Sequence, residues 1–314
     1  MTGVNDQMKI VIIGQSAFGR SVMEAVADTG KDNIVGVFPP PDREGRPVDP
    51  LKEGALDRSI PVHQHGRYRS QETIEAFKAL DADLCVMAFV TDIVPDELIE
   101  APKLGTIQYH PSLLPKHRGP SSINWPIIQG ETMTGLTVFW PDRGLDTGPV
   151  LLQKETEIDP DDTLGSLYFD RLYPMGVEAM VEAIDMVRDG TAPQIVQDES
   201  QATYESWVRS EDGVVDWSRS VATVYNLIRG CNPQPGASTI RNSEPLGLFD
   251  SERRDGDVDT APGTVTEISD IGFTVAVAGG QILVKRVRPQ NSRKISAAGW
   301  AYEAGLQIDE VLGD

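Results

Sequence analysis

The first half of the chain alternates short apolar runs with longer segments in which apolar residues recur every three or four positions. The apolar runs cover residues 8–14, 33–38, 83–89 and 105–109, and helical patterns cover 20–29 and 71–80. A short, β-branched apolar run predicts a buried strand, and a period near that of the α-helix predicts an amphipathic helix. Strands that alternate with helices form a parallel, doubly wound sheet, with sites beyond the carboxyl ends of the strands. We therefore expect an N-terminal α/β domain.

The middle of the chain predicts two further strands and a long helix. Residues 134–140 alternate as a strand, 149–155 form another, and helical periodicity extends over 163–189. The segment 191–206 that follows is polar and contains proline, which suits a linker.

Beyond this segment the pattern changes. Residues 220–229 predict one short helix, whereas 262–288 divides into the strand-sized pieces GTVTEI, FTVAVA and QILVKRV, separated by glycine-containing turns. Short strands at close spacing predict a small β-barrel or sandwich. We place the domain boundary near residue 204 and expect domains at 1–203 and 204–314.

The composition is that of a globular protein with a sizeable core, since 39% of the 314 residues are hydrophobic. No stretch approaches the roughly 20 uninterrupted apolar residues that a membrane helix needs. The first apolar run, Ile10 to Ile13, is also too short for a signal peptide. Cys85 and Cys231 lie far apart in sequence. We expect a reduced, cytoplasmic protein with no membrane partner.

The charge bears on the partner. Lys and Arg total 28 against 48 Asp and Glu, a net charge of −20. Such a field repels polyanions, whereas nucleic-acid binding usually requires a basic patch. The alternative is that the acidity serves only solubility or a saline habitat. Residues 201–314 carry 11 Lys and Arg against 16 Asp and Glu, a net charge of −5, so a tRNA partner is disfavoured there too.

Two motifs invite cofactor interpretations that we do not adopt. The turn Gly14 to Gly19 joins a predicted strand to a predicted helix, but the dinucleotide fingerprint G-x-G-x-x-G needs glycine where this chain has Ser16. We therefore expect no NAD. The H-x-H at 63–65 and His117 lack Cys or carboxylate neighbours at ligand spacing, so we expect loop histidines and no metal.

Two dense runs of unusual residues follow predicted strands, at 108–125 and 140–155. Their motifs H-P-S-L-L-P (110–115), R-G (118–119) and G-L-D-T-G (144–148) resemble the formyltransferase superfamily that uses 10-formyltetrahydrofolate. Within it, the N-terminal hydrolase domain of 10-formyltetrahydrofolate dehydrogenase is the most similar member, because its G-Q-S-x-F-G opening and F-W-x-D-x-G-L-D-T-G run also match.

The C-terminal part supports the same resemblance. The runs D-W (216–217), I-R-G-x-N-P-x-P-G-A (228–237), P-G-T-V (262–265) and L-V-K (283–285) are similar to the β-barrel domain shared with methionyl-tRNA formyltransferase. The resemblance thus covers nearly the whole chain. It implies a Rossmann-like catalytic domain with a mostly parallel sheet, followed by a small OB-like β-barrel domain.

The resemblance implies that His110 and Asp146 are the catalytic pair. Formyl transfer passes through a tetrahedral oxyanion, so the site needs a donor near the formyl oxygen and a base for the nucleophile. His110 would stabilise the oxyanion, and Asp146 would orient His110 and accept a proton. The alternatives are that His110 ends a strand and Asp146 belongs to a turn, without a catalytic role.

Gln108 departs from the family pattern. The transferases carry Asn two residues before the histidine, and the hydrolase domain carries an apolar residue there. The Gln108 amide can donate to the formyl oxygen, so we include it in the catalytic set. The alternative is a strand residue that faces away. This position leaves the acceptor, water or an amine, open.

The resemblance also implies a pterin pocket formed largely by backbone, from the loop after the third strand and the turn before Asp146. Its expected residues are Phe89, Val90, Thr91, Ile93, Ser112, Trp140, Asp142 and Leu145. Phe89 and Trp140 are alternatively core aromatics. Arg118 is expected to shape the loop over the acceptor channel, and a solvated surface arginine is its alternative.

Together these features predict an enzyme that removes the formyl group of 10-formyltetrahydrofolate and delivers it to water or a small amine. Methionyl-tRNA formyltransferase is the alternative, because the domain order matches and the charge does not. A folate-binding regulatory protein without turnover is a further alternative. No residues remain after the barrel for an aldehyde dehydrogenase domain, so we do not expect dehydrogenation from these 314 residues. The sequence leaves the oligomeric state open.

Overall fold

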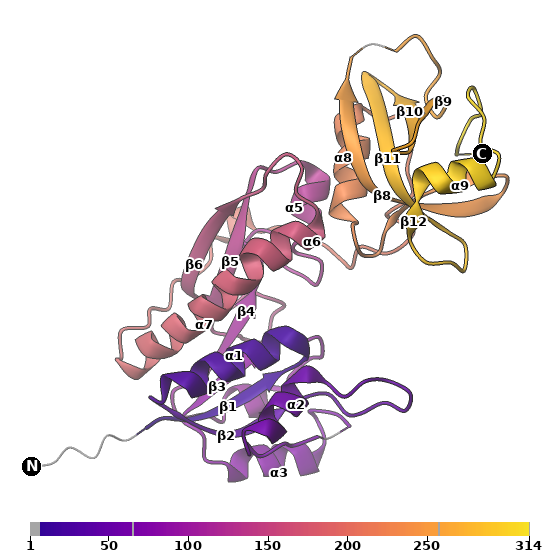
Figure 1. Ribbon diagram of the computed structural model, residues 1–314. Coiled ribbons are helices and arrows are strands. Elements are labelled where there is room, and N and C mark those ends of the chain that lie inside the picture. The colour runs from indigo at the N-terminus through magenta and orange to yellow at the C-terminus, as the bar shows by residue number, and fades with distance from the viewer. Residues whose placement is uncertain (1–6, 65, 257, 314) are drawn as a thin grey trace, which may run out of the picture. The chain divides into compact units, whose positions relative to one another are not determined.

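The computed structural model describes residues 7–64, 66–256 and 258–313, which form two compact units (Figure 1). The first unit comprises the chain up to Pro120 together with Gly135–Glu155 and Leu172–Tyr204. The second comprises Ser121–Thr134, Thr156–Arg171 and the residues from Glu205 onward. Both units are therefore built from separate stretches of sequence.

A six-stranded sheet forms the centre of the first unit. Its order is β2 (Asn33–Phe38), β1 (Lys9–Gly14), β3 (Leu84–Ala88), β4 (Thr106–His110), β5 (Met133–Phe139) and β6 (Val150–Glu157). The four strands from β2 to β4 pair in parallel, and β5 runs antiparallel to β4. The predicted α/β class with a mostly parallel sheet is confirmed.

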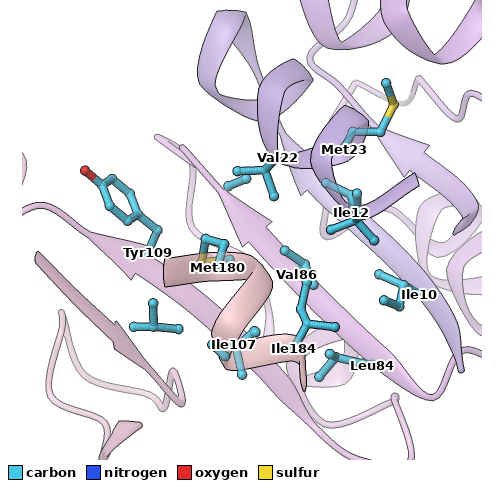
Figure 2. Close-up of a cluster of buried hydrophobic side chains, with 14 of the residues drawn as sticks. Ile10, Ile12, Val22, Met23, Leu84, Val86, Ile107, Tyr109, Met180 and Ile184 are labelled. Carbon is cyan, nitrogen blue, oxygen red and sulfur yellow. The ribbon is translucent and has the colours of Figure 1, made fainter. Parts of the chain in front are cut away.

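Helices bury both faces of this sheet, because side chains alternate along each strand. Ile10 and Ile12 point into a cluster with α1 (Ser16–Thr29) and α7 (Tyr173–Arg188), as Figure 2 shows. Val11 and Ile13 point to the opposite face, where α3 (Gln71–Ala79) contributes to a second cluster. Strands covered on both sides are continuously apolar, which is why the sequence predicted them well.

The helix that follows β1 begins earlier in the sequence than predicted. α1 begins at Ser16 rather than at residue 20. A Cβ on Gly14 would lie 2.4 Å from the carbonyl oxygen of Ala88, so glycine is required for the close approach of β3. The glycine therefore has a packing role in this turn.

The helical stretch predicted at 163–189 is helical but interrupted. It divides into α6 (Leu164–Ser166), a π-helical segment at Leu167–Leu172, and α7. Pro174 lies at the start of α7 and cannot donate a helical hydrogen bond, which favours an irregular turn before it.

The interpretation of 191–206 as a linker is wrong. Ile195 pairs with Val150, and Thr203 exchanges backbone hydrogen bonds with Pro115 and Arg118. A short 3₁₀ helix, Glu199–Gln201, lies between these contacts. The polar side chains of this segment bind backbone and charged groups of the first unit, rather than solvent alone.

The second unit contains an antiparallel sheet in the order β7 (Ala237–Arg241), β8 (Glu244–Asp255), β11 (Gly280–Pro289), β10 (Phe273–Val277) and β9 (Val265–Ile268). The short strand β12 (Ile295–Ser296) pairs with β11. The three strand-sized pieces predicted at 262–288 are confirmed as β9, β10 and β11. The strands β7 and β8 were not predicted, because polar residues interrupt their apolar pattern.

The remaining helices are short. In the first unit these are α2 (Pro50–Asp57) and α4 (Asp96–Ile99), and in the second α5 (Asn124–Gln129), α8 (Val221–Gly230) and α9 (Ala297–Glu303). The predicted helix at 220–229 corresponds to α8, whose first turn is capped by the Ser220 hydroxyl. Within the described part of the chain, no helix has both the length and the apolar character needed to span a bilayer.

Candidate active site

His110 is the last residue of β4, at the carboxyl end of the parallel part of the sheet. Its side chain is buried, and Nε2 lies 2.9 Å from the carbonyl oxygen of His117. A carbonyl oxygen only accepts hydrogen bonds, so Nε2 carries the proton in the neutral ring. Nδ1 is then the ring atom left with a lone pair.

Asp146 lies in the turn between β5 and β6, and its carboxylate reaches His110. Asp146 Oδ2 is 3.6 Å from His110 Nδ1 and accepts a hydrogen bond of 2.8 Å from the amide of Gly119. Both side chains are less than a tenth exposed, at 7% for His110 and 8% for Asp146. The structure thus brings the two residues together in an arrangement able to take up and release a proton at Nδ1.

The loop after His110 is held by its own hydrogen bonds. The Ser112 hydroxyl donates to the carbonyl of Lys116, and the Ser112 carbonyl accepts from the hydroxyl of Thr137 on β5. The same hydroxyl of Thr137 accepts from the amide of Leu114. Ser112 is fully buried, so its hydroxyl has a structural contact within the loop.

Arg118 is buried, and the alternative of a solvated surface arginine is wrong. Its Nη1 and Nη2 lie 3.0 and 2.7 Å from the two carboxylate oxygens of Glu199, a bidentate pair. Nη1 also hydrogen-bonds the hydroxyl of Tyr204, and the guanidinium lies 5.0 Å from the centre of that ring. The Glu199 hydrogen bond and the Tyr204 contact together raise the pKa of Arg118, so the group is permanently charged.

Gln197 connects Arg118 to Asp146. Its Oε1 accepts from Arg118 Nε at 3.1 Å and Nη2 at 2.7 Å. Its Nε2 donates to the carbonyls of Asp146 and Gly148 at 2.9 and 2.7 Å. The sequence interpretation missed Gln197, Glu199, Thr203 and Tyr204, because all four lie in the segment taken as a linker. The segment 191–206 contains no glycine, whereas flexible linkers are rich in glycine and serine. This was the sequence feature that argued against a linker.

Gln108 lies on the same face of the sheet as His110. It is two residues earlier on β4, and side chains two apart along a strand point to one side. Ile107 and Tyr109 point to the other side, into the core that Figure 2 shows. The alternative in which Gln108 faces away from His110 is therefore wrong, and the half-buried amide is available on the side of the imidazole.

The loop after β3 exposes apolar side chains beside this end of the sheet. Met87 pairs with Gln108 across the parallel strands, so Phe89 follows at the level of His110. Phe89 is 44% exposed and has a φ of 62°, a left-handed conformation. Val90 is half-buried and packs on the core opposite α1, whereas Ile93 is largely exposed.

Thr91, in the same loop, accepts a hydrogen bond from the side chain of Gln15 at the start of α1. This contact joins the loop after β3 to the turn after β1. The two strand ends are thus connected by side chains as well as by the sheet.

The turn before Asp146 has a defined internal structure. The exposed Asp142 carboxylate accepts hydrogen bonds from the amide of Gly144 and the hydroxyl of Thr147, which closes the turn. Leu145 is largely exposed. Trp140 is half-buried, packs against the main core and donates its indole N–H to the carbonyl of Pro193. Its ring therefore has a core contact, as the alternative interpretation held.

The two other histidines that the structure describes, His63 and His117, do not assemble a metal site. His63 stacks on Phe38 with ring centres 4.9 Å apart, His117 is buried, and His65 lies outside the described residues. In the residues that the structure describes, no group of three or more His, Cys, Asp and Glu side chains is arranged to hold a metal ion.

Fold and site together define an α/β enzyme domain with a buried imidazole–carboxylate pair at its strand ends, followed by an antiparallel domain. Residues 8–184 match the formyl transferase family and residues 208–304 match the formyl transferase C-terminal domain. The chain belongs to the formyl transferase family.

Two curated relatives cover almost the whole chain. Cytosolic 10-formyltetrahydrofolate dehydrogenase of Xenopus tropicalis is 39% identical over 320 residues, which are 96% of this chain and 35% of the relative. The chain thus spans about a third of that protein. Methionyl-tRNA formyltransferase of Trichlorobacter lovleyi is 37% identical and is covered almost completely, with 97% of this chain and 96% of the relative aligned.

A solved structure has the same fold. HypX from Aquifex aeolicus, in complex with tetrahydrofolic acid, superposes with a TM-score of 0.68 at 21% identity. The match covers 97% of this chain and 49% of that protein. The shared architecture therefore includes both units of the chain.

Proposed function

We propose that this protein removes the formyl group of 10-formyltetrahydrofolate with His110 and Asp146 as its catalytic pair, and delivers it to water or a small amine. The contact between the two buried side chains, 3.6 Å from His110 Nδ1 to Asp146 Oδ2, carries the proposal. Membership of the formyl transferase family and the relative named for 10-formyltetrahydrofolate support the donor.

The chemistry follows from the contacts of the pair. Because His110 Nε2 is engaged by the carbonyl of His117, Nδ1 is the ring nitrogen available to the reacting group. A proton on Nδ1 would stabilise the oxyanion that forms when a nucleophile adds to the formyl carbon. Asp146 would accept the proton that the nucleophile loses. When the tetrahedral intermediate collapses, the bond from carbon to the folate nitrogen breaks, and that nitrogen takes the proton that Asp146 accepted from the nucleophile.

The folate pocket is part of the proposal. We assign the pterin to the strand ends beside His110, where Phe89, Ile93 and Leu145 leave apolar surface exposed and Val90 and Thr91 offer backbone groups. The buried Ser112 and Arg118, the turn-forming Asp142 and the core-packed Trp140 would support the pocket through the loops that they hold.

Gln108 would be the third member of the catalytic set. It lies on the face of β4 that carries His110, and its amide is a hydrogen-bond donor of the kind that a formyl oxygen accepts. A glutamine side chain is one methylene longer than the asparagine of the transferases, so the donor reaches further from the strand. This difference favours a site that accommodates a small nucleophile.

The acceptor is assigned from charge. A net charge of −20 disfavours tRNA, which leaves water or a small amine. Methionyl-tRNA formyltransferase is the second candidate, because a relative of that name aligns over 96% of its own length. A folate-binding regulatory protein without turnover is a third, and the buried pair argues against it.

We also propose that residues 1–203 form the catalytic domain and 204–314 a separate C-terminal domain. The proposed boundary falls between the two family matches, which cover residues 8–184 and 208–304.

One assay separates these candidates. The protein is incubated with 10-formyltetrahydrofolate, and tetrahydrofolate and formate are followed with and without aminoacylated initiator tRNA. Release of both products without tRNA is expected for the proposed hydrolase. Tetrahydrofolate that appears only with tRNA would favour the second candidate, and folate binding without turnover under any condition would favour the third. If a small amine is the acceptor, adding it will replace formate by the formylated amine.

A further inference from the structure

Gln197 makes four hydrogen bonds at a point where two site loops meet. The side chain is 7% exposed and lies between the guanidinium of Arg118 and the turn that carries Asp146. Arginine nitrogens only donate and backbone carbonyls only accept, so the orientation of the amide is determined by its partners. Oε1 must face Arg118, and Nε2 must face the carbonyls of Asp146 and Gly148.

The backbone of Asp146 needs such an anchor. Asp146 has a φ of 57°, in the left-handed region that a residue with a Cβ adopts rarely. The two carbonyls that Gln197 binds belong to residues 146 and 148, on either side of Thr147. Fixing both peptide groups fixes the direction in which the Asp146 side chain leaves the backbone.

The direction of that side chain determines its contacts. From this backbone, Oδ2 reaches both the amide of Gly119 at 2.8 Å and His110 Nδ1 at 3.6 Å. Gly119 follows Arg118 directly, and Arg118 is itself bound by Gln197. The side-chain amide of Gln197 therefore binds both the loop of Arg118 and the turn of Asp146. The separation of this loop and this turn sets the distance between the Asp146 carboxylate and the groups that it contacts.

We propose that Gln197 is a positioning residue that aligns Asp146 with His110 through the two hydrogen bonds donated by its Nε2. The effect of Gln197 on kcat that this inference predicts rests on the proposed function. The inference goes beyond that function in assigning a role to a residue that does not contact His110.

Two variants separate the role of the amide oxygen of Gln197 from that of its amide nitrogen. Gln197→Glu keeps an acceptor for Arg118 but loses the donors to the Asp146 and Gly148 carbonyls, whereas Gln197→Met loses both. We expect each variant to lower kcat roughly 100-fold, because displacements of about 1 Å at a catalytic group have effects of this size. KM for the folate should stay within about threefold, since Gln197 is not placed in the folate pocket.

Gln64→Met is the matched control. Gln64 also joins a cation to a backbone carbonyl, accepting from Lys52 Nζ at 2.7 Å and donating to the Pro40 carbonyl at 2.7 Å. It has no contact with Asp146, so its kcat should be unchanged. Full activity of folded Gln197→Glu would overturn the proposal, because it would show that only the Arg118 contact matters.

A spectroscopic measurement distinguishes failure of this inference from failure of the proposed function. The imidazole ¹⁵N resonances of His110 should shift in both Gln197 variants, as in Asp146→Asn, whatever reaction the protein catalyses. Unchanged resonances in folded variants would overturn the positioning role, whereas an inactive wild type would overturn the proposed function alone. If neither variant folds, the inference is tested on the wild-type protein. There, both side-chain amide protons of Gln197 should exchange slowly with solvent, and rapid exchange would contradict the inference.

Discussion

The Oδ2 atom of Asp146 lies 3.6 Å from Nδ1 of His110 while it accepts a hydrogen bond from the amide of Gly119. The backbone amide holds the carboxylate whether or not the imidazole is protonated. The carboxylate can therefore stay in place while a proton is taken up and released at Nδ1. The separation is slightly longer than a hydrogen bond, so the amide of Gly119 rather than the imidazole fixes the carboxylate.

Replacing either member of the pair should abolish turnover. His110→Ala removes the donor to the oxyanion and Asp146→Ala removes the base, so each should lower formate release at least about 100-fold. Neither change removes the proposed pterin contacts, so folate affinity measured by calorimetry should stay within about tenfold. Substantial activity in either variant would refute the assigned pair.

Gln108 gives a separate test of the oxyanion site. Gln108→Leu keeps the size of the side chain but removes its donor, and loss of one oxyanion donor typically lowers kcat by about 100-fold or more. Gln71→Leu, on the exposed surface of α3, is the matched control and should have wild-type activity. Equal activity of the two variants would mean that Gln108 only fills its strand position.

The sequence predicted the elements that bury the most apolar surface and the residues that carry the family motifs. The strands β1 and β3 were recognisable because nearly all of their residues are apolar. His110 and Asp146 were recognisable from their motifs. Strand β8 was missed because its second half, from Asp250 to Asp255, is polar.

The contacts of Arg118 could not be predicted in the same way. Its partners Gln197 and Glu199 lie 79 and 81 positions further along the chain. Polar side chains in an irregular segment have no periodicity, so nothing local indicates what they bind. Only the folded chain shows that a segment taken as a linker satisfies a buried charge.

Arg118 should therefore matter for stability as well as for the loop that it holds. Arg118→Met removes a buried cation and leaves the acceptor Oε1 of Gln197 without its donors. We expect a loss of about 2 kcal/mol in the free energy of unfolding, as for a buried hydrogen-bond acceptor that loses its donors. Chemical denaturation of the full chain measures it. Arg209→Met, at a position 68% exposed, should change stability by less than about 0.5 kcal/mol. Equal effects of both changes would contradict this interpretation of Arg118.

Both cysteines should be inert in the folded protein. Burial raises the pKa of the Cys85 thiol to about 12, and burial is also the main cause that raises the pKa of Cys231 to about 12. The reactive thiolate is therefore scarce near pH 8. A thiol reagent such as dithiobis(nitrobenzoate) should modify neither residue in native buffer and both in guanidinium chloride. Rapid labelling of the folded chain would show that one thiol becomes accessible by local opening.

The C-terminal unit should lose stability in acid through Glu310. Its carboxylate forms a bidentate pair with Arg241, at 2.6 Å to Nε and 3.2 Å to Nη2, and this hydrogen bonding holds the pKa of Glu310 below its ordinary value. A carboxylate with a lowered pKa stabilises the fold fully above its ordinary pKa of about 4.3, and this stabilisation is lost as the pH falls through the lowered value.

Glu310→Gln tests this contribution. The variant should be about 1 kcal/mol less stable than wild type at pH 7, because the pair is partly screened by solvent. The difference should shrink as the pH falls from the ordinary pKa of a glutamate through the lowered pKa of Glu310, because the carboxylate then takes up its proton. Denaturant unfolding of the full chain at several pH values measures both quantities. Glu303→Gln, on the exposed surface of α9, is the control and should follow wild type throughout. A Glu310→Gln difference that stays constant down to pH 2 would mean that the pair acts through shape rather than charge.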